Sequence, residues 1–169
     1  MRLFLAVLPD EAARDALCTV QQRMYEKGLR GSYDDRNNFH LTLAYIGEYP
    51  DPQEILRLLA PVRCGRFSLT LSAPGCFRKL YWCGVKDSRE LDTLAAQVRQ
   101  CLKDAGIPFD QKAFVPHITL LRKAYSDNDV LQHVMVPDAA WEVNRISLMR
   151  SERGEHGMIY TEIAQLSLQ

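Results

Sequence analysis

The chain alternates between short apolar runs, which are typical of strands, and longer stretches with apolar residues at helical spacing. The apolar run 3–8 predicts a buried strand, and Asp10 is placed to cap the helix that follows. Apolar residues of this helix recur at helical spacing: Ala13, Leu17, Val20 and Met24. Gly28 ends the helix, and the polar segment 31–38 predicts a turn.

The rest of the chain repeats these patterns. Strands are predicted at 39–46, 67–71, 79–85, 115–121, 144–149 and 158–168. Helices are predicted after the capping segments 51–54 and 87–90, and a weaker one at 129–135. Pro74-Gly75 predicts a turn, and the polar segment 151–157 predicts a loop.

Two of the predicted strands carry the same pattern of histidine, apolar residue, threonine and apolar residue. These are His40-Leu41-Thr42-Leu43 and His117-Ile118-Thr119-Leu120, which are 77 positions apart. Side chains alternate between the faces of a strand, so His and Thr share one face while their apolar neighbours enter the core.

The same shift of 77 residues relates the two halves of the chain. It maps Phe4 onto Tyr81, Asp10 onto Asp87, Leu17 onto Leu94, Leu69 onto Ile146 and Leu71 onto Leu148. The order strand, helix, His-x-Thr strand, helix, strand therefore occurs twice. A duplicated unit can bring equivalent strands together around a pseudo-twofold axis, and we expect both His/Thr faces to line one cleft.

Composition limits the class of protein. A length of 169 residues is typical of one domain, and 47% apolar with 25% charged residues is ordinary for a globular protein. The formal net charge of zero argues against bulk electrostatic capture of long nucleic acids, although local arginines could hold a small anion. Five cysteines without a CxxC pair favour reduced, buried thiols in a cytoplasmic protein. No segment reaches transmembrane length, and we expect no membrane association and a monomer.

Two histidines facing one phosphorus can divide proton transfer between them. A neutral imidazole takes a proton from water while an imidazolium protonates the departing oxygen. Threonine hydroxyls on the same face can bind the non-bridging phosphate oxygens. This chemistry needs no metal or other cofactor, and no H-E-x-x-H motif or Cys/His cluster predicts a zinc site. A half-buried structural histidine remains the alternative for either motif alone, and His133 and His156 are predicted to face solvent.

The pair of motifs resembles the two HxTx motifs of the 2H phosphoesterase superfamily. The surrounding segments 2–7, 38–48 and 116–122, together with Ser151, Gly157 and Tyr160, are similar to the bacterial RNA 2′,3′-cyclic phosphodiesterases, also called 2′-5′ RNA ligases. The similarity covers nearly the whole chain, so residues 1–169 are expected to form one 2H phosphoesterase domain of two pseudo-symmetric lobes.

The resemblance implies a bilobal α+β fold in which antiparallel sheets line a central groove and helices pack outside. It implies an enzyme that hydrolyses the 2′,3′-cyclic phosphate of RNA ends or nucleotides to a 2′-phosphomonoester. By motif order, His40 is the proton donor to the leaving 3′ oxygen, His117 is the proton acceptor, and Thr42 and Thr119 bind the phosphate. With an RNA 5′-hydroxyl in place of water, the same site would form a 2′-5′ bond.

Arg122 matches a family arginine that follows the second motif, and its guanidinium suits phosphate. It lies five positions after His117, an odd offset, so a regular strand would direct it away from the cleft. Either the strand ends or bulges there, or Arg122 is a surface residue. Candidates for stacking on a base are Phe4, Tyr45, Tyr81 and Phe114, any of which could instead be core. The polar segment 34–38 replaces tryptophan and proline that relatives often carry, which puts the nucleotide-binding rim in doubt.

Two further interpretations remain open. The chain could be a non-catalytic module that binds RNA or nucleotides in the same groove. It could also be a phosphodiesterase for another small cyclic phosphate or for a 2′-5′ oligonucleotide.

Overall fold

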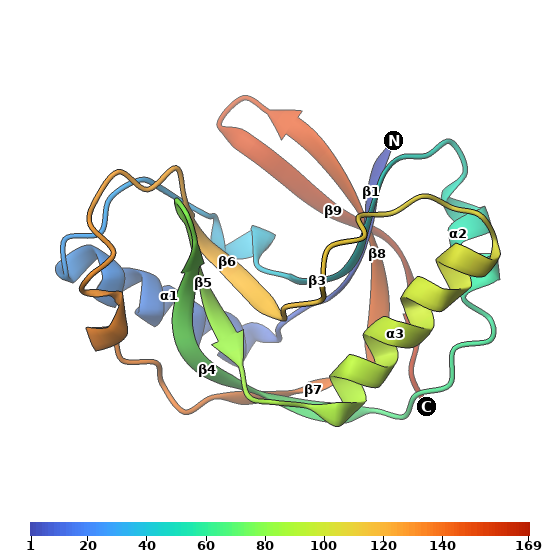
Figure 1. Cartoon of the computed structure of the whole chain (residues 1–169), viewed down its shortest axis with the longest axis horizontal. Helices are drawn as coiled ribbons and strands as arrows, with labels where there is room; N and C mark the ends of the chain where they lie inside the picture. Colours follow the sequence, from blue (N-terminus) through green and yellow to red (C-terminus); the bar gives the residue numbers. More distant parts are fainter.

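A computed structural model describes residues 1–169 and contains one curled antiparallel sheet with helices on its outer side (Figure 1). The strand order is β7-β4-β5-β6-β3-β1-β8-β9, and β2 pairs with β6 beside this path. The strands are β1 Arg2–Val7, β2 Ser32–Tyr33, β3 Leu41–Glu48, β4 Phe67–Phe77, β5 Leu80–Val85, β6 His117–Arg122, β7 Ala140–Val143, β8 Arg145–Gly154 and β9 Gly157–Ser167. The predicted α+β arrangement of antiparallel strands and outer helices is confirmed.

Three α-helices begin at the capping residues that the sequence indicates. They are α1 Glu11–Glu26, α2 Pro52–Leu58 and α3 Arg89–Asp104. The carboxylate of Asp10 accepts a hydrogen bond from the Ala13 backbone N–H at 2.8 Å, and the Ser88 hydroxyl accepts one at the start of α3. These caps satisfy backbone donors that have no partner inside the helix. The helix α1 packs against β6 and β7, whereas α3 packs against β3.

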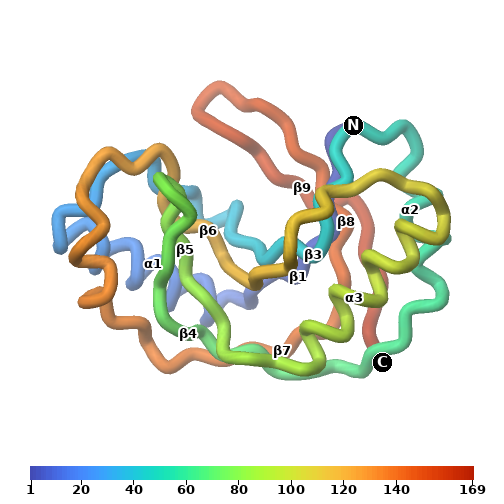
Figure 2. The backbone as a smooth tube through the Cα atoms, in the orientation of Figure 1, coloured from blue at the N-terminus to red at the C-terminus, as the bar shows by residue number.

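The 77-residue repeat is visible in how the strands pair. The strand β1 lies between β3 and β8, and the equivalent β5 lies between β6 and β4. The two sets meet where β3 pairs with β6, through the single residue pair Leu41 and Ile118, which are themselves 77 positions apart. The backbone trace in Figure 2 shows that the two sets curve around a shared concave side.

The prediction of a turn at Pro74-Gly75 is wrong. The strand β4 continues to Phe77, and Gly75 pairs with Trp82 of β5. A Cβ atom at Gly75 would overlap the Trp82 ring, so glycine here leaves room for that ring and does not mark a turn. The hairpin instead reverses after Phe77, where Arg78 has a φ of 56°.

The polar segment 151–157 is also not a loop. It extends β8 and β9 into a long hairpin that projects beyond the rest of the sheet (Figure 1), with Gly154 paired to Gly157 at its tip. Both faces of this projection meet solvent or the groove, which explains why its sequence lacks an apolar alternation. The predicted helix at 129–135 is only a 3₁₀ turn, Leu131–His133, and the short strands β2 and β7 were not predicted.

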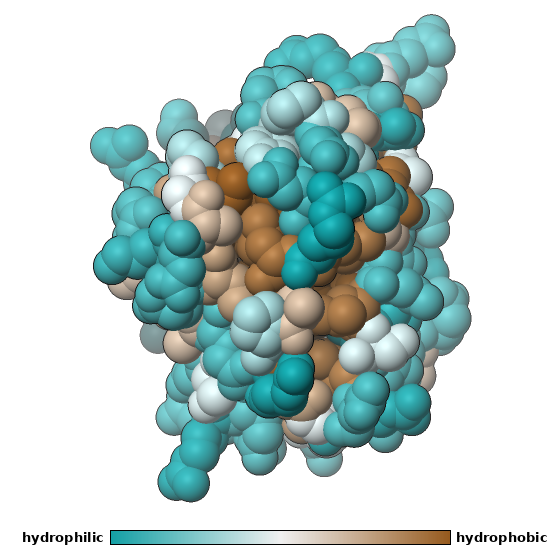
Figure 3. All heavy atoms as spheres, turned by 90° about the vertical axis from the view of Figure 1, so that its right-hand side faces the viewer, coloured by the Kyte–Doolittle hydropathy of each residue, from teal (hydrophilic) through white to brown (hydrophobic).

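The core lies between the sheet and its helices. Alternate residues of β1, Leu3, Leu5 and Val7, enter a cluster of 38 buried residues, whereas Phe4 packs on the other face with Met149. Hydrophobic residues also gather in the middle of the face that carries α2 and α3, with hydrophilic residues around them (Figure 3).

All five cysteines are free thiols, but the prediction that they are buried holds only for Cys83. The other four, Cys18, Cys64, Cys76 and Cys101, are half-buried. None of the helices combines the length and the hydropathy that a membrane-spanning helix needs.

Candidate active site

Residues of the two His-x-Thr motifs line one cavity of about 560 Å³ on the concave side of the sheet. The cavity brings together all five residues singled out from the sequence: His40, Thr42, His117, Thr119 and Arg122. His133 and His156 are exposed elsewhere, as predicted. No group of three or more His, Cys, Asp or Glu side chains has a metal-binding arrangement.

The pairing of β3 with β6 sets the geometry of the two motifs. Leu41 pairs with Ile118 in an antiparallel register. Continuing this register by one residue sets His40 opposite Thr119 and Thr42 opposite His117, on the same face. The two histidines are then diagonal neighbours, a relation in which residues of facing strands are roughly 7–8 Å apart. The same register sets each histidine across from the threonine of the other motif.

A bulge in β6 explains why Arg122 lines the cavity despite its odd offset from His117. In the pairing with β5, Tyr81 faces Leu121 while Trp82 faces Thr119, which leaves Leu120 as an extra residue. Leu120 and Leu121 are both fully buried, so the alternation is reversed after the bulge. The guanidinium therefore returns to the face that carries His117.

The first motif contains the same bulge at the equivalent position. In the pairing of β1 with β3, Leu5 faces Ala44 while Ala6 faces Thr42, which leaves Leu43 as the extra residue. Tyr45 is thereby directed into the cavity, 77 positions before Arg122. Its hydroxyl accepts a hydrogen bond from the Arg2 guanidinium at 2.7 Å.

Both histidines are fixed through the same backbone contact. Nδ1 of His40 lies 2.7 Å from the carbonyl oxygen of Asn38, and Nδ1 of His117 lies 2.6 Å from that of Val115. A carbonyl only accepts hydrogen bonds, so Nδ1 carries the proton and Nε2 of each neutral imidazole is left as a proton acceptor.

Burial lowers the pKa of both imidazoles. The pKa of His40 falls from 6.5 to about 4, chiefly through burial and further through the positive charge of Arg122, although the Asn38 carbonyl opposes this. The pKa of His117 is lowered for the same reasons, with the Val115 carbonyl opposing. Both side chains are consequently neutral at pH 7 in the ligand-free protein.

Comparison with known proteins identifies the family of the chain. The family model described as the 2′-5′ RNA ligase superfamily matches residues 8–155. The chain belongs to the 2′-5′ RNA ligase superfamily. The "RNA 2′,3′-cyclic phosphodiesterase" of Thermotoga maritima is 29% identical over 95% of this chain and 91% of its own. The protein of the same name from Aeropyrum pernix is 31% identical over 89% and 93%.

Two solved structures have the same fold. The crystal structure of E. coli LigT in apo form has a TM-score of 0.81 at 29% identity, covering 99% of this chain and 96% of its own. LigT has also been crystallised with 3′-AMP, and that structure has a TM-score of 0.80 at 28% identity, covering 99% and 97%.

The guanidinium of Arg122 is held by a carboxylate that the motif does not include. Its Nε donates to Asp34 Oδ1 at 3.0 Å and Oδ2 at 3.3 Å, and the terminal nitrogens make no hydrogen bond within the protein. The Asp34 side chain is only 8% exposed. Burial raises the pKa of Asp34, and the charge of Arg122 counteracts this shift. The ion pair leaves the two terminal nitrogens available for a ligand in the cavity.

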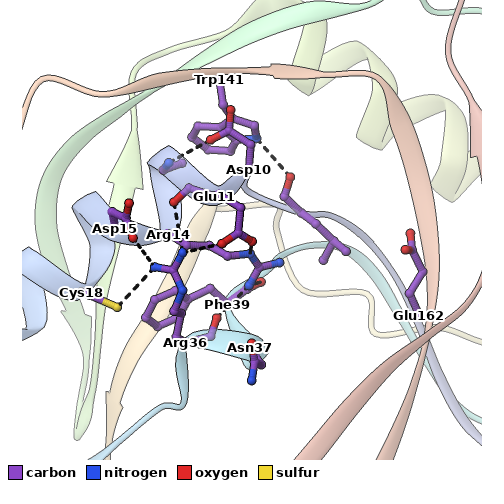
Figure 4. A network of polar contacts seen from close by, with 12 residues as sticks. Asp10, Glu11, Arg14, Asp15, Cys18, Arg36, Asn37, Phe39, Trp141 and Glu162 are labelled. Carbon is purple, nitrogen blue, oxygen red and sulfur yellow. Dashed lines mark hydrogen bonds and ion pairs between the residues drawn. The ribbon is translucent and has the colours of Figure 1, made fainter.

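The polar segment before His40 is held by a network on α1 (Figure 4). Arg36 forms ion pairs with Glu11 at 2.6 Å and Asp15 at 2.7 Å, and Arg14 donates to the Arg36 carbonyl oxygen at 2.7 Å. The Asn38 amide also donates to a carbonyl of β9 at 2.8 Å. The ion pairs of Arg36 thus hold the segment that carries the Asn38 carbonyl, and this carbonyl fixes the ring of His40.

The aromatic candidates separate into three groups. Phe4 and Tyr45 line the cavity, and the centroid of the Phe4 ring lies 4.7 Å from that of His40. Tyr81 is only 2% exposed and belongs to the core, so it is not a stacking platform. Phe114 lines a neighbouring hollow against Arg99.

Sequence reasoning missed residues that reach the cavity from other elements. Arg153 and Met158 come from the projecting hairpin, and Asp110 comes from the segment after α3. Tyr160, quoted above only for the family resemblance, packs edge-on against His40 at 5.0 Å. No spacing rule connects these positions with the motifs, because the sheet brings them together.

Proposed function

We propose that this chain hydrolyses the 2′,3′-cyclic phosphate of RNA ends or nucleotides to a 2′-phosphomonoester. The observation that carries the proposal is the pair of histidines, each fixed by a backbone carbonyl, in one cavity that the threonines of both motifs also line. The superfamily membership and the names of the relatives support the same reaction.

His117 accepts the proton of a water molecule at Nε2 as the water oxygen forms a bond to phosphorus. The bond from phosphorus to the 3′ oxygen breaks, and His40 donates a proton to that oxygen. Thr42 and Thr119 donate hydrogen bonds to the non-bridging oxygens, and the terminal nitrogens of Arg122 neutralise their charge. The 2′ phosphomonoester then leaves, and exchange with solvent restores both imidazoles.

The low pKa of His40 fits a proton donor that becomes charged only with substrate. In the ligand-free cavity the imidazole is neutral at pH 7, because its pKa is about 4. A bound phosphate anion favours the imidazolium and raises this pKa toward the working pH. His40 thus becomes the acid in the complex.

An RNA 5′-hydroxyl in place of water gives a 2′-5′ phosphodiester through the same bond changes. Cleavage of that bond reverses the roles, so that His40 accepts a proton from the 3′-hydroxyl and His117 donates to the departing 5′ oxygen. We also infer that the chain works in the cytoplasm as a monomer, with residues 1–169 acting as one unit and without a metal ion.

Turnover of 2′,3′-cyclic AMP and of a short RNA with a cyclic end tests the proposal, in EDTA and with analysis of the product. The expected product carries a 2′-phosphate. His40→Ala and His117→Ala should each lower kcat by about 10²- to 10⁴-fold with the fold retained. His133→Ala, which removes an exposed histidine outside the cavity, is the matched control.

Near-wild-type turnover in either cavity variant would contradict the acid/base assignment. Binding of the cyclic ends without product would identify a binding module, and turnover only of other cyclic phosphates or 2′-5′ oligonucleotides would change the substrate. Loss of turnover in EDTA that added metal restores would contradict the metal-free reaction.

A further inference from the structure

A second hollow of about 500 Å³ adjoins the catalytic cavity. The two share four lining residues, Thr42, Tyr45, Asp110 and His117, so they form one continuous groove. The lining that belongs to the second hollow alone is Phe77, Arg99, Lys112, Ala113, Phe114 and Val115. This second hollow lies beyond His117. We call it the base-side pocket.

The base-side pocket combines exposed apolar surface with a cation. Phe77 is 42% exposed, although it is a large aromatic residue, and its ring meets His117 edge-on at 5.0 Å. Lys112 is 90% exposed, and its closest carboxylate, Asp110, is 4.0 Å away. An exposed ring beside an ammonium group suits a nucleobase and the phosphate attached to its nucleoside.

Arg99 fixes the wall of this pocket through two of its guanidinium nitrogens. Its Nε donates to the Leu43 carbonyl at 3.0 Å and its Nη1 donates to the Lys112 carbonyl at 2.8 Å. The guanidinium also lies over the ring of Phe114. The segment 112–114 is therefore anchored to β3, and Lys112 is the more exposed cation of the pocket.

The position of the pocket indicates which ligand binds in it. In an in-line displacement the attacking oxygen and the leaving oxygen lie on opposite sides of phosphorus. The 3′ oxygen leaves beside His40, so the nucleophile arrives beside His117, where the groove opens into the base-side pocket. Water needs no such pocket, whereas a nucleoside with a 5′-hydroxyl does.

We propose that the base-side pocket binds the first nucleoside of an RNA strand with a free 5′-hydroxyl, the strand that is joined or released through a 2′-5′ bond. The proposal rests on the function proposed above. Phe77 stacks on the base, and Lys112 contacts the phosphate that follows it. The 5′ oxygen forms a bond to phosphorus, its proton passes to His117 Nε2, the bond to the 3′ oxygen breaks, and His40 protonates that oxygen.

The test compares three reactions of the full chain. One is hydrolysis of 2′,3′-cyclic AMP, the second is joining of an RNA with a cyclic end to an RNA with a 5′-hydroxyl, and the third is cleavage of a 2′-5′-linked ApA dinucleotide. The variants are Phe77→Leu, which keeps apolar packing against His117, and Lys112→Ala, which keeps the carbonyl that Arg99 binds. Lys103→Ala, at an exposed lysine in the last turn of α3, is the matched control.

Phe77→Leu is expected to raise the KM for the 5′-hydroxyl strand and for the dinucleotide by about tenfold, because base stacking on an aromatic ring is lost. Lys112→Ala is expected to raise the KM for the 5′-hydroxyl strand several-fold and to reduce its salt dependence. Hydrolysis of 2′,3′-cyclic AMP should stay within about twofold in both variants, and Lys103→Ala should change none of the three reactions.

Equal losses of hydrolysis and joining would overturn the proposal, because the pocket would then hold the base of the cyclic nucleotide. Unchanged joining and cleavage in both variants would overturn it too. A wild-type protein that hydrolyses cyclic ends but neither forms nor cleaves 2′-5′ bonds would refute this proposal and leave the proposed hydrolysis intact. Absence of hydrolysis would refute both.

Discussion

The buried imidazole of His40 makes a quantitative prediction about stability. Its pKa is about 4 in the folded protein and 6.5 as the ordinary value, so the unfolded chain binds more protons at this residue between these two pH values. The unfolding free energy therefore falls as the pH is lowered from about 6.5 toward 4. The contribution of His40 lost between about pH 7.5 and pH 4.5 is about 2.5 kcal/mol, with one pKa unit equal to about 1.4 kcal/mol.

NMR titration of His40 measures its pKa directly, and the His40→Asn variant assigns the signal. We expect the His40 midpoint well below the ordinary value of 6.5 in the ligand-free protein. Addition of 2′-AMP, whose phosphate favours the imidazolium, should move the midpoint upward.

Urea unfolding at both pH values provides the energetic check. The wild-type protein should lose about 2.5 kcal/mol more than His40→Asn over this interval, because the variant removes the proton binding of this residue. A ligand-free midpoint near 6.5, or the same pH dependence in wild type and His40→Asn, would refute the conclusion that burial governs this histidine.

Further predictions follow from the ion pair, the close strand contact and the two histidines. Asp34→Asn should lower kcat/KM for cyclic phosphate by about tenfold, since Arg122 loses its charged acceptor. Asp35→Asn, at an exposed residue, should not lower it. Equal kcat/KM values for the two variants would contradict a positioning role of Asp34. Gly75→Ala should lower the unfolding free energy by about 1–3 kcal/mol, because the added methyl group overlaps the Trp82 ring, and urea unfolding followed by tryptophan fluorescence measures this. The bell-shaped pH profile of kcat/KM should be centred below 6.5, because the pKa values of both histidines are lowered in the free protein; a centre at pH 7 or above would contradict those shifts.

The sequence predicts the repeated motifs and the cavity they share because both depend on local alternation and on a fixed spacing. The sequence leaves undecided which face of the strand carries Arg122. A bulge moves the side chains after it to the opposite face without changing the residue composition of the strand. The adjacent apolar pairs Leu43-Ala44 and Leu120-Leu121 are the available signal, since a regular strand with one polar face would not place two buried residues in succession.

Other features depend on partners that are distant in sequence. The sequence does not distinguish Asp34 from other polar residues, because its role depends on Arg122, which the sheet places against it. In the sequence Gly75 indicates a turn, whereas in the structure the Trp82 ring occupies the space above it. The aromatic surface at Phe77 follows from the unexpected length of β4, which carries this residue past the predicted turn to the edge of the groove.

The single residue pair between β3 and β6 has a mechanical consequence. If each half of the sheet came from one half of the chain, this one residue pair would be the only strand pairing that holds the two halves together. Instead β8 and β9, from the second repeat, complete the half that contains β1, while β4, from the first repeat, completes the half that contains β5. The repeats are interlocked by exchanged strands, so the histidines keep their separation through chain connectivity, and neither repeat alone retains an intact half of the site.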